Sequence, residues 1–292
     1  MLLFNQGYEK NDRIPQPSSG CTMQGREGSY MKNVVITGST RGIGLAMALE
    51  FLRAGCRVTL SGRGDTPAPE TVAALLPFKG RFLYVPCDVR DRASLQDLWD
   101  VSLQHWSTVD IWISNAGRNV PHRAVWETGE TYTRQVFDTN LLGMVYGSQV
   151  AAAEMLRQGH GAVYAMEGLG SNNMIQPKTI LYGTTKHALT YFMKGLAREL
   201  EGTGVIAGRL SPGMMLTDFI TKAPDGEPSE VILDKRFRRV FNILADRPEP
   251  VAAFFIPRML GNTKNNARIA WLTNRKAAWR FLTAVRRKGR LI

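Results

Sequence analysis

The chain has 292 residues, of which 44 % are hydrophobic and 21 % are charged, values that are ordinary for a globular protein and exclude wholesale disorder. It contains no run of about 18 apolar residues that could cross a bilayer, and its three cysteines and four histidines lack the spacing of a disulfide framework or a metal site, so we predict no bound metal. The net charge of +12 is compatible with an anionic small molecule, an anionic lipid or nucleic acid, but no nucleic-acid motif accompanies it and we expect no nucleic-acid partner.

The first residues of the chain differ in pattern from the rest. Residues 1–32 show no hydrophobic periodicity and contain Pro15, Pro17 and four glycines, which predicts a mobile leader. From Asn33 onward, short apolar runs rich in β-branched residues alternate with segments of helical spacing. The expected strands are residues 34–36, 58–60, 82–85, 111–113, 162–165, 205–210 and 269–273. This alternation predicts the α/β class, with a single doubly wound parallel sheet of Rossmann type over residues 33–273.

A glycine-rich turn follows the first expected strand. It consists of Thr37, Gly38, Ser39, Thr40, Arg41, Gly42, Ile43 and Gly44. A chain that passes from strand to helix against a pyrophosphate needs one glycine for the turn, one for the approach of the ligand and one for helix–strand packing. The helix N-terminus then offers free N–H groups to the phosphates. A glycine-rich surface loop is the alternative, but the position between a strand and a helix favours a nucleotide site.

The end of the second expected strand indicates which nucleotide binds. Sites for NAD usually place a carboxylate there, which binds the ribose 2′-hydroxyl. Here the strand runs into Ser61, Gly62 and Arg63, without an acid at its tip. Arg63, together with Arg41 of the glycine-rich turn, could bind a 2′-phosphate through charge-assisted hydrogen bonds. The two arginines could instead be solvated surface residues, but the missing acid favours NADP or NADPH as the cofactor.

Motifs in a fixed order give the chain a resemblance to the short-chain dehydrogenase/reductase family over residues 33–273. Besides the glycine-rich turn, these motifs are Asp88-Val89, Asn115-Ala116-Gly117, Asn140, Tyr182 with Lys186, and Pro212-Gly213 with Thr217. The resemblance implies that Asp88 and Val89 contact the adenine, that Asn140 bends a helix and that the Pro212 segment lies beside the nicotinamide. It also implies a homodimer or a homotetramer.

Tyr182 and Lys186 would carry the catalytic chemistry. Residues four apart on a helix share one face, so both side chains can point into one cleft. A phenol titrates at about pH 10, and a neighbouring ammonium group lowers its pKa toward the range useful in acid–base catalysis. We therefore expect a lowered pKa for Tyr182, and the resemblance implies that Lys186 also holds the nicotinamide ribose. A tyrosine and a lysine at this spacing are otherwise often only a helix surface.

The serine that usually completes the family's catalytic set is displaced. The position thirteen residues before Tyr182 is Leu169, and the nearest hydroxyl belongs to Ser171. In this respect residues 166–171 are similar to the Met-Asp-Gly-x-Gly-Ser segment of chlorophyll b reductases, with Glu167 in place of the aspartate. Further similar segments are residues 110–117, 211–218, 241–243 and 257–259, and an Arg-Arg-x-Gly-Arg stretch near the C-terminus.

This narrower resemblance implies NADPH-dependent reduction of the C7 formyl group of chlorophyll b or chlorophyllide b, a tetrapyrrole pigment, to a 7-hydroxymethyl group. Tyr182 would donate the proton, Ser171 would orient the formyl oxygen, and Lys186 with Asn140 would position the cofactor and relay protons. Residues 214–242 contain helix breakers suited to a movable loop and are the expected substrate lid. Two alternatives stay open: a reductase of another bulky carbonyl compound, and a noncatalytic NADP-binding sensor or scaffold.

The C-terminal residues 274–292 form a basic segment in which we predict a helix that carries aromatic and aliphatic side chains. Such a helix can lie on an anionic membrane surface, or it can pack on the domain with its charges solvated, and both interpretations stay open. A pigment substrate, itself bound to membranes, adds weight to the first. The expected location is the cytoplasm or the plastid stroma, peripheral to a photosynthetic membrane under the first interpretation.

Overall fold

The computed structural model describes residues 31–222, 229–284 and 291–292. The chain divides into a unit of residues 1–30 and a unit of residues 31–292, and all described residues belong to the second unit. The predicted leader therefore lies outside the described residues except for Met31 and Lys32.

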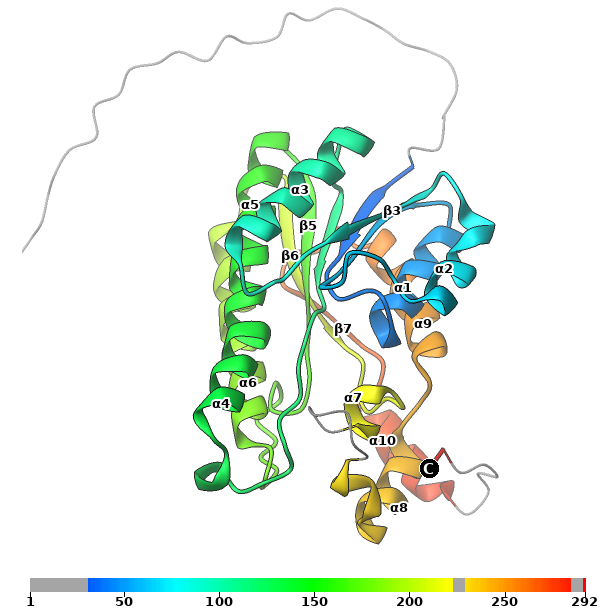
Figure 1. The fold of residues 1–292 in the computed structure, drawn as a ribbon, viewed down its shortest axis with the longest axis vertical. Helices are drawn as coiled ribbons and strands as arrows, with labels where there is room; N and C mark the ends of the chain where they lie inside the picture. Colours follow the sequence, from blue (N-terminus) through cyan, green and yellow to red (C-terminus); the bar gives the residue numbers. More distant parts are fainter. Residues whose placement is uncertain (1–30, 223–228, 285–290) are drawn as a thin grey trace, which may run out of the picture. The chain divides into compact units, whose positions relative to one another are not determined.

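Seven parallel strands form one sheet in the order β3-β2-β1-β4-β5-β6-β7. The strands are β1 (Asn33–Ile36), β2 (Arg57–Gly62), β3 (Phe82–Pro86), β4 (Ile111–Ser114), β5 (Gly161–Met166), β6 (Val205–Ser211) and β7 (Ala267–Ala270). The strand order reverses between β1 and β4, and open α/β sheets bind ligands at such a point, beyond the carboxyl ends of the strands. The predicted doubly wound parallel sheet is confirmed (Figure 1).

The last strand differs in position from the prediction. We expect it over residues 269–273, but β7 spans Ala267–Ala270. The backbone N–H of Asn266 donates to the carbonyl oxygen of Ala207 at 2.8 Å, so pairing with β6 begins earlier than the apolar run suggests. At the other end Thr273 is the N-cap of helix α10 and is not part of the strand.

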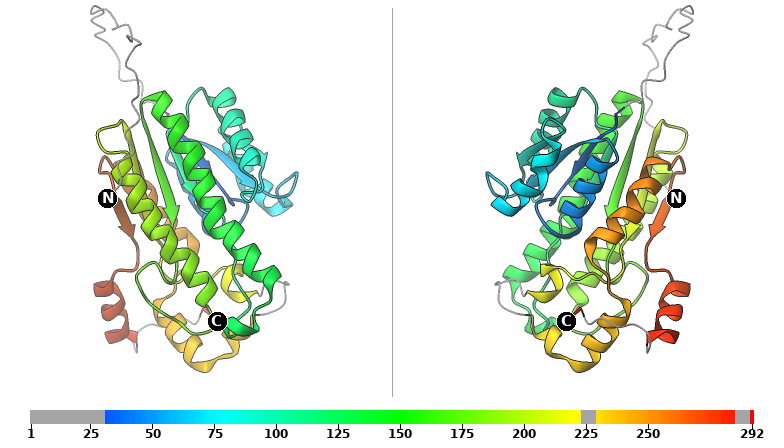
Figure 2. Two further views of the ribbon diagram at one scale, coloured as in Figure 1. Left: turned by 90° about the vertical axis from the view of Figure 1, so that its left-hand side faces the viewer. Right: turned by 90° about the vertical axis from the view of Figure 1, so that its right-hand side faces the viewer.

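Helices cover both faces of the sheet (Figures 1 and 2). They are α1 (Gly42–Arg53), α2 (Pro69–Leu75), α3 (Arg92–Trp106), α4 (Glu130–Phe137), α5 (Gly143–Gln158), α6 (Ile180–Glu199), α7 (Asp218–Thr221), α8 (Lys235–Leu244), α9 (Pro248–Leu260) and α10 (Asn274–Leu282). Apolar side chains of α1 and α9 form one buried cluster with the sheet, and those of α3, α5 and α6 form a second. A parallel sheet is buried on both faces in this way because its crossover helices cover it.

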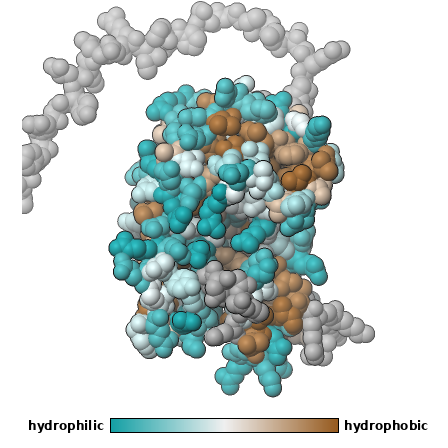
Figure 3. All heavy atoms as spheres, in the orientation of Figure 1, coloured by the Kyte–Doolittle hydropathy of each residue, from teal (hydrophilic) through white to brown (hydrophobic). Residues whose placement is uncertain are grey.

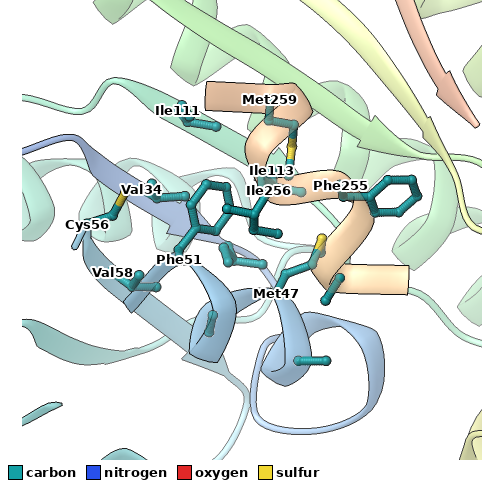
Figure 4. Packing of buried hydrophobic residues seen from close by; sticks show 14 of the residues in the cluster. Val34, Met47, Phe51, Cys56, Val58, Ile111, Ile113, Phe255, Ile256 and Met259 are labelled. Carbon is teal, nitrogen blue, oxygen red and sulfur yellow. The ribbon is translucent and has the colours of Figure 1, made fainter. Parts of the chain in front are cut away.

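The cluster under α1 and α9 shows how the sheet is held between its helices. Met47 and Phe51 of α1 lie against Phe255, Ile256 and Met259 of α9 (Figure 4). All five side chains are at most 3 % exposed, so they are fully removed from water, which is the dominant stabilising contribution to such a core. This packing fixes helix α1, whose N-terminal end completes the glycine-rich turn.

Candidate active site

A cleft of about 1910 Å³ is lined by the turn between β1 and α1, by the segments after β4, β5 and β6, and by helix α6. It therefore lies at the carboxyl ends of the strands, where the strand order reverses. The predicted site residues that line it are Gly38, Thr40, Arg41, Gly42, Ile43, Gly44, Arg63, Asp88, Val89, Asn115, Ala116, Gly117, Ser171, Tyr182, Lys186, Pro212, Gly213 and Thr217. The other three, Thr37, Ser39 and Asn140, are at most 2 % exposed and lie behind the residues that line the cleft.

The glycine-rich turn is shaped by three glycines with different constraints. Gly38 and Gly42 adopt φ angles of +62° and +56°, in the left-handed region that favours glycine. A Cβ on Gly44 would lie 2.4 Å from the carbonyl oxygen of Gly38 and 2.6 Å from Nδ2 of Asn115, so only glycine permits this approach of α1 to the turn. Because the start of α1 lines the cleft, its free N–H groups fit the pyrophosphate of a dinucleotide.

Polar side chains join this turn to the neighbouring strands. The Thr37 hydroxyl accepts hydrogen bonds from the backbone N–H groups of Asn115 and Ala116 at 3.0 and 3.1 Å. In return Nδ2 of Asn115 donates to the carbonyl oxygen of Thr37 at 3.0 Å. The Ser39 hydroxyl accepts from the backbone N–H of Ser61 at 2.9 Å. These contacts therefore hold the turn in position, while the buried Oδ1 of Asn115 has no hydrogen-bond partner among the described residues.

Arginines gather at the end of the cleft near β2 and β3. Arg63 is exposed after β2 and lines a recess that it shares with Arg41. Arg118 also lines the cleft, and no sequence motif marks it beyond its place after Gly117. The pKa of the Arg118 guanidinium is lowered mainly by burial and to a smaller extent by the charge of Arg63. The buried Nε of Arg118 has no hydrogen-bond partner among the described residues. An unsatisfied cation of this kind fits an anionic ligand.

The predicted adenine-contacting pair, Asp88 and Val89, lies after β3. Nε of Arg90 donates to both carboxylate oxygens of Asp88 at 3.0 Å, and this hydrogen bonding holds the pKa of Asp88 below its usual range. Val89 packs against the start of α5, where a Cβ on Gly143 would lie 2.8 Å from Cγ2 of Val89. Both residues line the cleft, but the Asp88 carboxylate is already bound by Arg90.

Asn140 lies in a single π-helical turn, Asp138–Leu142, between α4 and α5. Its Oδ1 accepts from the backbone N–H of Arg118 at 2.7 Å, and its Nδ2 donates to the carbonyl oxygen of Arg118 at 2.9 Å. The same Nδ2 lies 3.5 Å from the Thr185 hydroxyl. Asn140 therefore connects the segment after β4 with helix α6, and insertions of this type are frequent at functional sites.

Helix α6 brings Tyr182 and Lys186 to the cleft one turn apart. Nζ of Lys186, which is 5 % exposed, donates to the carbonyl oxygen of Met166 at 2.8 Å and lies 5.8 Å from the centroid of the Tyr182 ring. A Cβ on Gly168 would lie 2.2 Å from the Tyr182 hydroxyl oxygen. The predicted tyrosine–lysine pair therefore meets at the end of β5, where glycine leaves room for the hydroxyl.

Burial determines how both groups titrate. The sequence predicts a lowered pKa for Tyr182, and this prediction is wrong: burial raises its pKa, because a phenolate loses its hydration there. Burial also lowers the pKa of Lys186 to about 8, while the charge of Glu167 acts in the opposite direction. A phenol with a raised pKa stays protonated at neutral pH, which suits a proton donor.

Ser171 lines the cleft, but its hydroxyl is bound to the backbone. It donates to the carbonyl oxygen of Lys186 at 3.1 Å and accepts from the backbone N–H of Gly168 at 3.1 Å. The Thr190 hydroxyl donates to the same Lys186 carbonyl at 3.1 Å, so that carbonyl keeps a donor if Ser171 turns toward a substrate. The role of Ser171 in orienting the substrate oxygen stays a prediction.

The segment after β6 covers Tyr182. The ring of Phe219 in α7 lies edge-on to that of Tyr182, with 5.4 Å between the centroids. Met214, Met215 and Ile220 line the cleft as well. Arg41 and Asp218 form an ion pair at 3.6 Å, which links this segment to the glycine-rich turn. The helix breakers of the expected lid, residues 224–228, lie outside the described residues.

Comparison with known proteins identifies the class to which this fold and cleft belong. The family model described as short chain dehydrogenase matches residues 32–228, and the chain belongs to that family. It is 31 % identical over 277 residues to a probable chloroplastic chlorophyll(ide) b reductase of Arabidopsis thaliana, covering 89 % of this chain and 54 % of the relative. It is also 31 % identical over 264 residues to a chloroplastic chlorophyll(ide) b reductase of Oryza sativa subsp. japonica, covering 87 % and 75 %. The chain thus spans about half the length of the Arabidopsis relative.

Solved structures share the fold at lower identity. A 3-ketoacyl-(acyl-carrier-protein) reductase from Brucella melitensis, crystallised with NADH, superimposes with a TM-score of 0.71 at 19 % identity, covering 84 % of this chain and 98 % of that one. A protein named ElxO, with NADP bound, gives a TM-score of 0.71 at 24 % identity, covering 82 % and 96 %. These structures support the short-chain dehydrogenase architecture, and the family match makes the chain an oxidoreductase.

Proposed function

We propose that the protein reduces the C7 formyl group of chlorophyll b or chlorophyllide b to a hydroxymethyl group with NADPH. The observation that carries the proposal is the position of the Tyr182 hydroxyl against Gly168. Gly168 belongs to residues 166–171, the segment that resembles chlorophyll b reductases. The identity of 31 % to two plant proteins of that name, over 87 % and 89 % of this chain, supports the same substrate class.

The residues of the cleft can divide the reaction between them. When bound, NADPH supplies the hydride that forms the new C–H bond. Tyr182 donates its phenolic proton to the formyl oxygen, which becomes the hydroxyl of the product. Lys186, charged below its pKa of about 8, stabilises the phenolate that remains on Tyr182. Asn140 positions the reacting groups by connecting helix α6 with the segment after β4.

The size and lining of the cleft suit a bulky apolar substrate. Its volume of about 1910 Å³ exceeds the roughly 300–1,000 Å³ of ordinary ligand pockets, which leaves room for a large ring system beside a dinucleotide. Apolar side chains that line the cleft from the segments after β6 are Met214, Met215, Phe219, Val231, Phe237 and Val240. Such a lining favours a tetrapyrrole over a small polar carbonyl compound.

The experiment that tests the proposal is turnover of chlorophyllide b by the purified chain with NADPH, followed by absorbance and chromatography. Appearance of the 7-hydroxymethyl product is the expected result. Binding of NADPH without any conversion of chlorophyllide b or chlorophyll b would reject the pigment as substrate. Other bulky aldehydes and ketones would then be screened, which tests the alternative reductase.

Arg63 provides a test of the cofactor. We expect Arg63→Ala to raise the KM for NADPH by about 10- to 100-fold, because a charge-assisted hydrogen bond to the 2′-phosphate contributes about 1.5–3 kcal/mol. The KM for NADH should change by less than about threefold, since NADH lacks that phosphate. Arg198→Ala, an exposed arginine outside the cleft, is the matched control. An equal change in the KM for NADPH and for NADH would show that Arg63 does not bind the 2′-phosphate.

We propose in addition that helix α10 contacts an anionic membrane surface. Arg280 fixes the inner side of α10, since its guanidinium donates to the carbonyl oxygen of Leu244 at 2.7 Å and to Asp246 at 3.0 Å. On the outer side, Trp279 is 66 % and Leu282 is 80 % exposed, and Figure 3 shows apolar surface where α8 and α10 lie. The structure thus supports a helix that is packed on the domain and still presents apolar side chains, as interfacial helices do.

The membrane proposal predicts binding to vesicles of anionic lipid. The wild type should sediment with such vesicles at low salt and less at high salt, because basic side chains contribute to the attraction. Trp279→Ala with Leu282→Ala should lower the bound fraction by about tenfold or more, since about 2–3 kcal/mol of apolar burial is lost. Leu76→Ala, an exposed leucine elsewhere, is the control. Equal loss in both variants would contradict a role of α10.

Location and assembly complete the proposal. No helix in the described ranges is long and apolar enough to span a membrane. The plant relatives are named chloroplastic, and we propose that this chain lies in the plastid stroma or the cytoplasm, peripheral to a photosynthetic membrane.

The family implies a homodimer or a homotetramer. Leu156 of α5 and Tyr191 of α6 are exposed and are candidates for the contact between subunits, which light scattering of Tyr191→Asp tests.

A further inference from the structure

Three consecutive residues at the end of β5 contact or adjoin the reacting groups. Met166 offers its carbonyl oxygen to Nζ of Lys186 at 2.8 Å. Gly168 leaves the space into which the Tyr182 hydroxyl fits, since a Cβ there would lie 2.2 Å from it. Between them stands Glu167, which is 3 % exposed. The mechanism described above assigns no role to this buried carboxylate.

Glu167 is held by arginines of the two neighbouring strands β6 and β7. Nε of Arg268 in β7 donates to one carboxylate oxygen at 2.8 Å, and Arg209 in β6 lies 3.6 Å from the other oxygen. That second oxygen, Oε1, has no hydrogen-bond partner among the described residues. A buried carboxylate is unfavourable unless it is paired, and this one is only partly satisfied by its arginines. Such an arrangement is typical of a group retained for function.

We propose that Glu167 is a positioning residue that keeps Lys186 in its ammonium form, by anchoring the turn at residues 166–168 and by placing a negative charge beside it. This inference rests on the proposed roles of Tyr182 and Lys186. The carboxylate lines the cleft, but its proposed role requires no direct contact with the substrate. It acts through Lys186, whose charge stabilises the phenolate of Tyr182 after proton transfer.

The charged and titratable groups around Lys186 determine the sign of the expected effect. Tyr182 and His187 belong to the same helix, Glu167 directly follows β5, and Arg209 and Arg268 come from β6 and β7. Burial lowers the pKa of Lys186 to about 8, and Glu167 opposes this change. Lys186 is charged below its pKa, so loss of the Glu167 charge must shift its deprotonation to lower pH.

The direct test is the titration of Lys186 in the full chain by NMR, with lysine labelled with carbon-13 at Cε. Loss of one signal in Lys186→Arg assigns the resonance. In Glu167→Gln the midpoint should fall by about one pH unit, the size expected for removal of one nearby opposite charge. In Glu167→Asp it should stay within about 0.3 pH units of the wild type, since the charge is kept. An unchanged midpoint in Glu167→Gln overturns the proposal.

Two further variants separate charge from general disruption. If Glu167→Gln does not fold, Glu167→Gln with Arg209→Met removes the carboxylate together with a buried counter-charge, and a downward shift no larger than that expected for Glu167→Gln alone should result. Arg209→Met alone removes a positive charge, so the midpoint should equal or exceed that of the wild type. A downward shift in Arg209→Met would show that any disturbance of the cluster lowers the midpoint, and would reject the charge effect.

Turnover distinguishes failure of this inference from failure of the proposed function. The pH at which turnover declines on the alkaline side should move down with the Lys186 midpoint in Glu167→Gln, and Glu167→Asp should restore it. A purely structural role would lower turnover by the same factor at every pH, which contradicts the inference. Absence of chlorophyllide b conversion by the wild type would instead reject the proposed function, whatever the titration of Lys186 shows.

Discussion

Replacement of Tyr182 by phenylalanine is expected to lower turnover of chlorophyllide b by about 10³-fold, within the range of roughly 10² to 10⁴ that general acid catalysis contributes. The substitution removes one oxygen atom and keeps the ring that packs edge-on against Phe219. Burial raises the pKa of Tyr182, so in the wild type the phenol is protonated throughout the neutral range and ready to donate. The affinity for NADPH, measured by fluorescence titration, should change by less than about twofold because Lys186 and the glycine-rich turn are intact.

A fully buried tyrosine outside the cleft provides the control. Tyr164 of β5 is 0 % exposed, and its hydroxyl accepts a hydrogen bond from Nδ2 of Asn262 at 2.9 Å, outside the cleft. Tyr164→Phe should leave turnover within about twofold and lower the free energy of unfolding by about 1 kcal/mol. If Tyr182→Phe retained a substantial part of the wild-type rate, another group would have to supply the proton. If the wild type showed no turnover at all, the sensor or scaffold alternative would gain support.

The parts of the fold and site that the sequence predicts are those fixed by local chemistry. Gly38, Gly42 and Gly44 can be recognised because a strand-to-helix turn around a pyrophosphate needs a positive φ or a close approach of the backbone at those places. The spacing of Tyr182 and Lys186 is readable because one helical turn separates them. The parallel sheet follows from short buried runs alternating with helices, and all seven expected strands are present.

What the sequence does not reveal depends on residues that are distant along the chain. Glu167 and Arg268 are 101 positions apart, so no spacing rule pairs them. The direction of the pKa shift of Tyr182 depends on how completely α6 and α7 bury it, and the ammonium four residues away predicts the opposite sign. The hydroxyl of Ser171 is directed by the carbonyl of Lys186, a contact that only the folded turn creates. Arg118 becomes notable only through its unsatisfied, buried Nε.

Replacement of Gly168 by alanine should lower turnover by about 10²-fold, the loss that follows when a reacting group is displaced by about 1 Å. A Cβ at this position would lie 2.2 Å from the Tyr182 hydroxyl oxygen and 3.2 Å from Cγ of Lys186. Gly168 is not among the glycines with a positive φ, so alanine can adopt its backbone conformation. The effect is therefore steric, and it falls on the end of the Tyr182 side chain, which must move away from β5. Binding of NADPH and the thermal midpoint should change little by comparison.

The matched control for Gly168→Ala is Gly195→Ala in helix α6, where an added Cβ would meet nothing within 4 Å. That variant should keep full turnover and gain about 0.5–1 kcal/mol in the free energy of unfolding, because alanine is the better helix former. The two losses at the site should not add: Gly168→Ala in a Tyr182→Phe background should lower turnover by less than about threefold more, since the displaced hydroxyl is already absent. Wild-type turnover in Gly168→Ala would mean that the proton is not donated from the position that Tyr182 occupies beside Gly168. A further large loss in the double variant would mean that Gly168 affects the reaction through a group other than this hydroxyl. That group would be Lys186, because its Cγ is the nearest side-chain atom to the added methyl outside Tyr182.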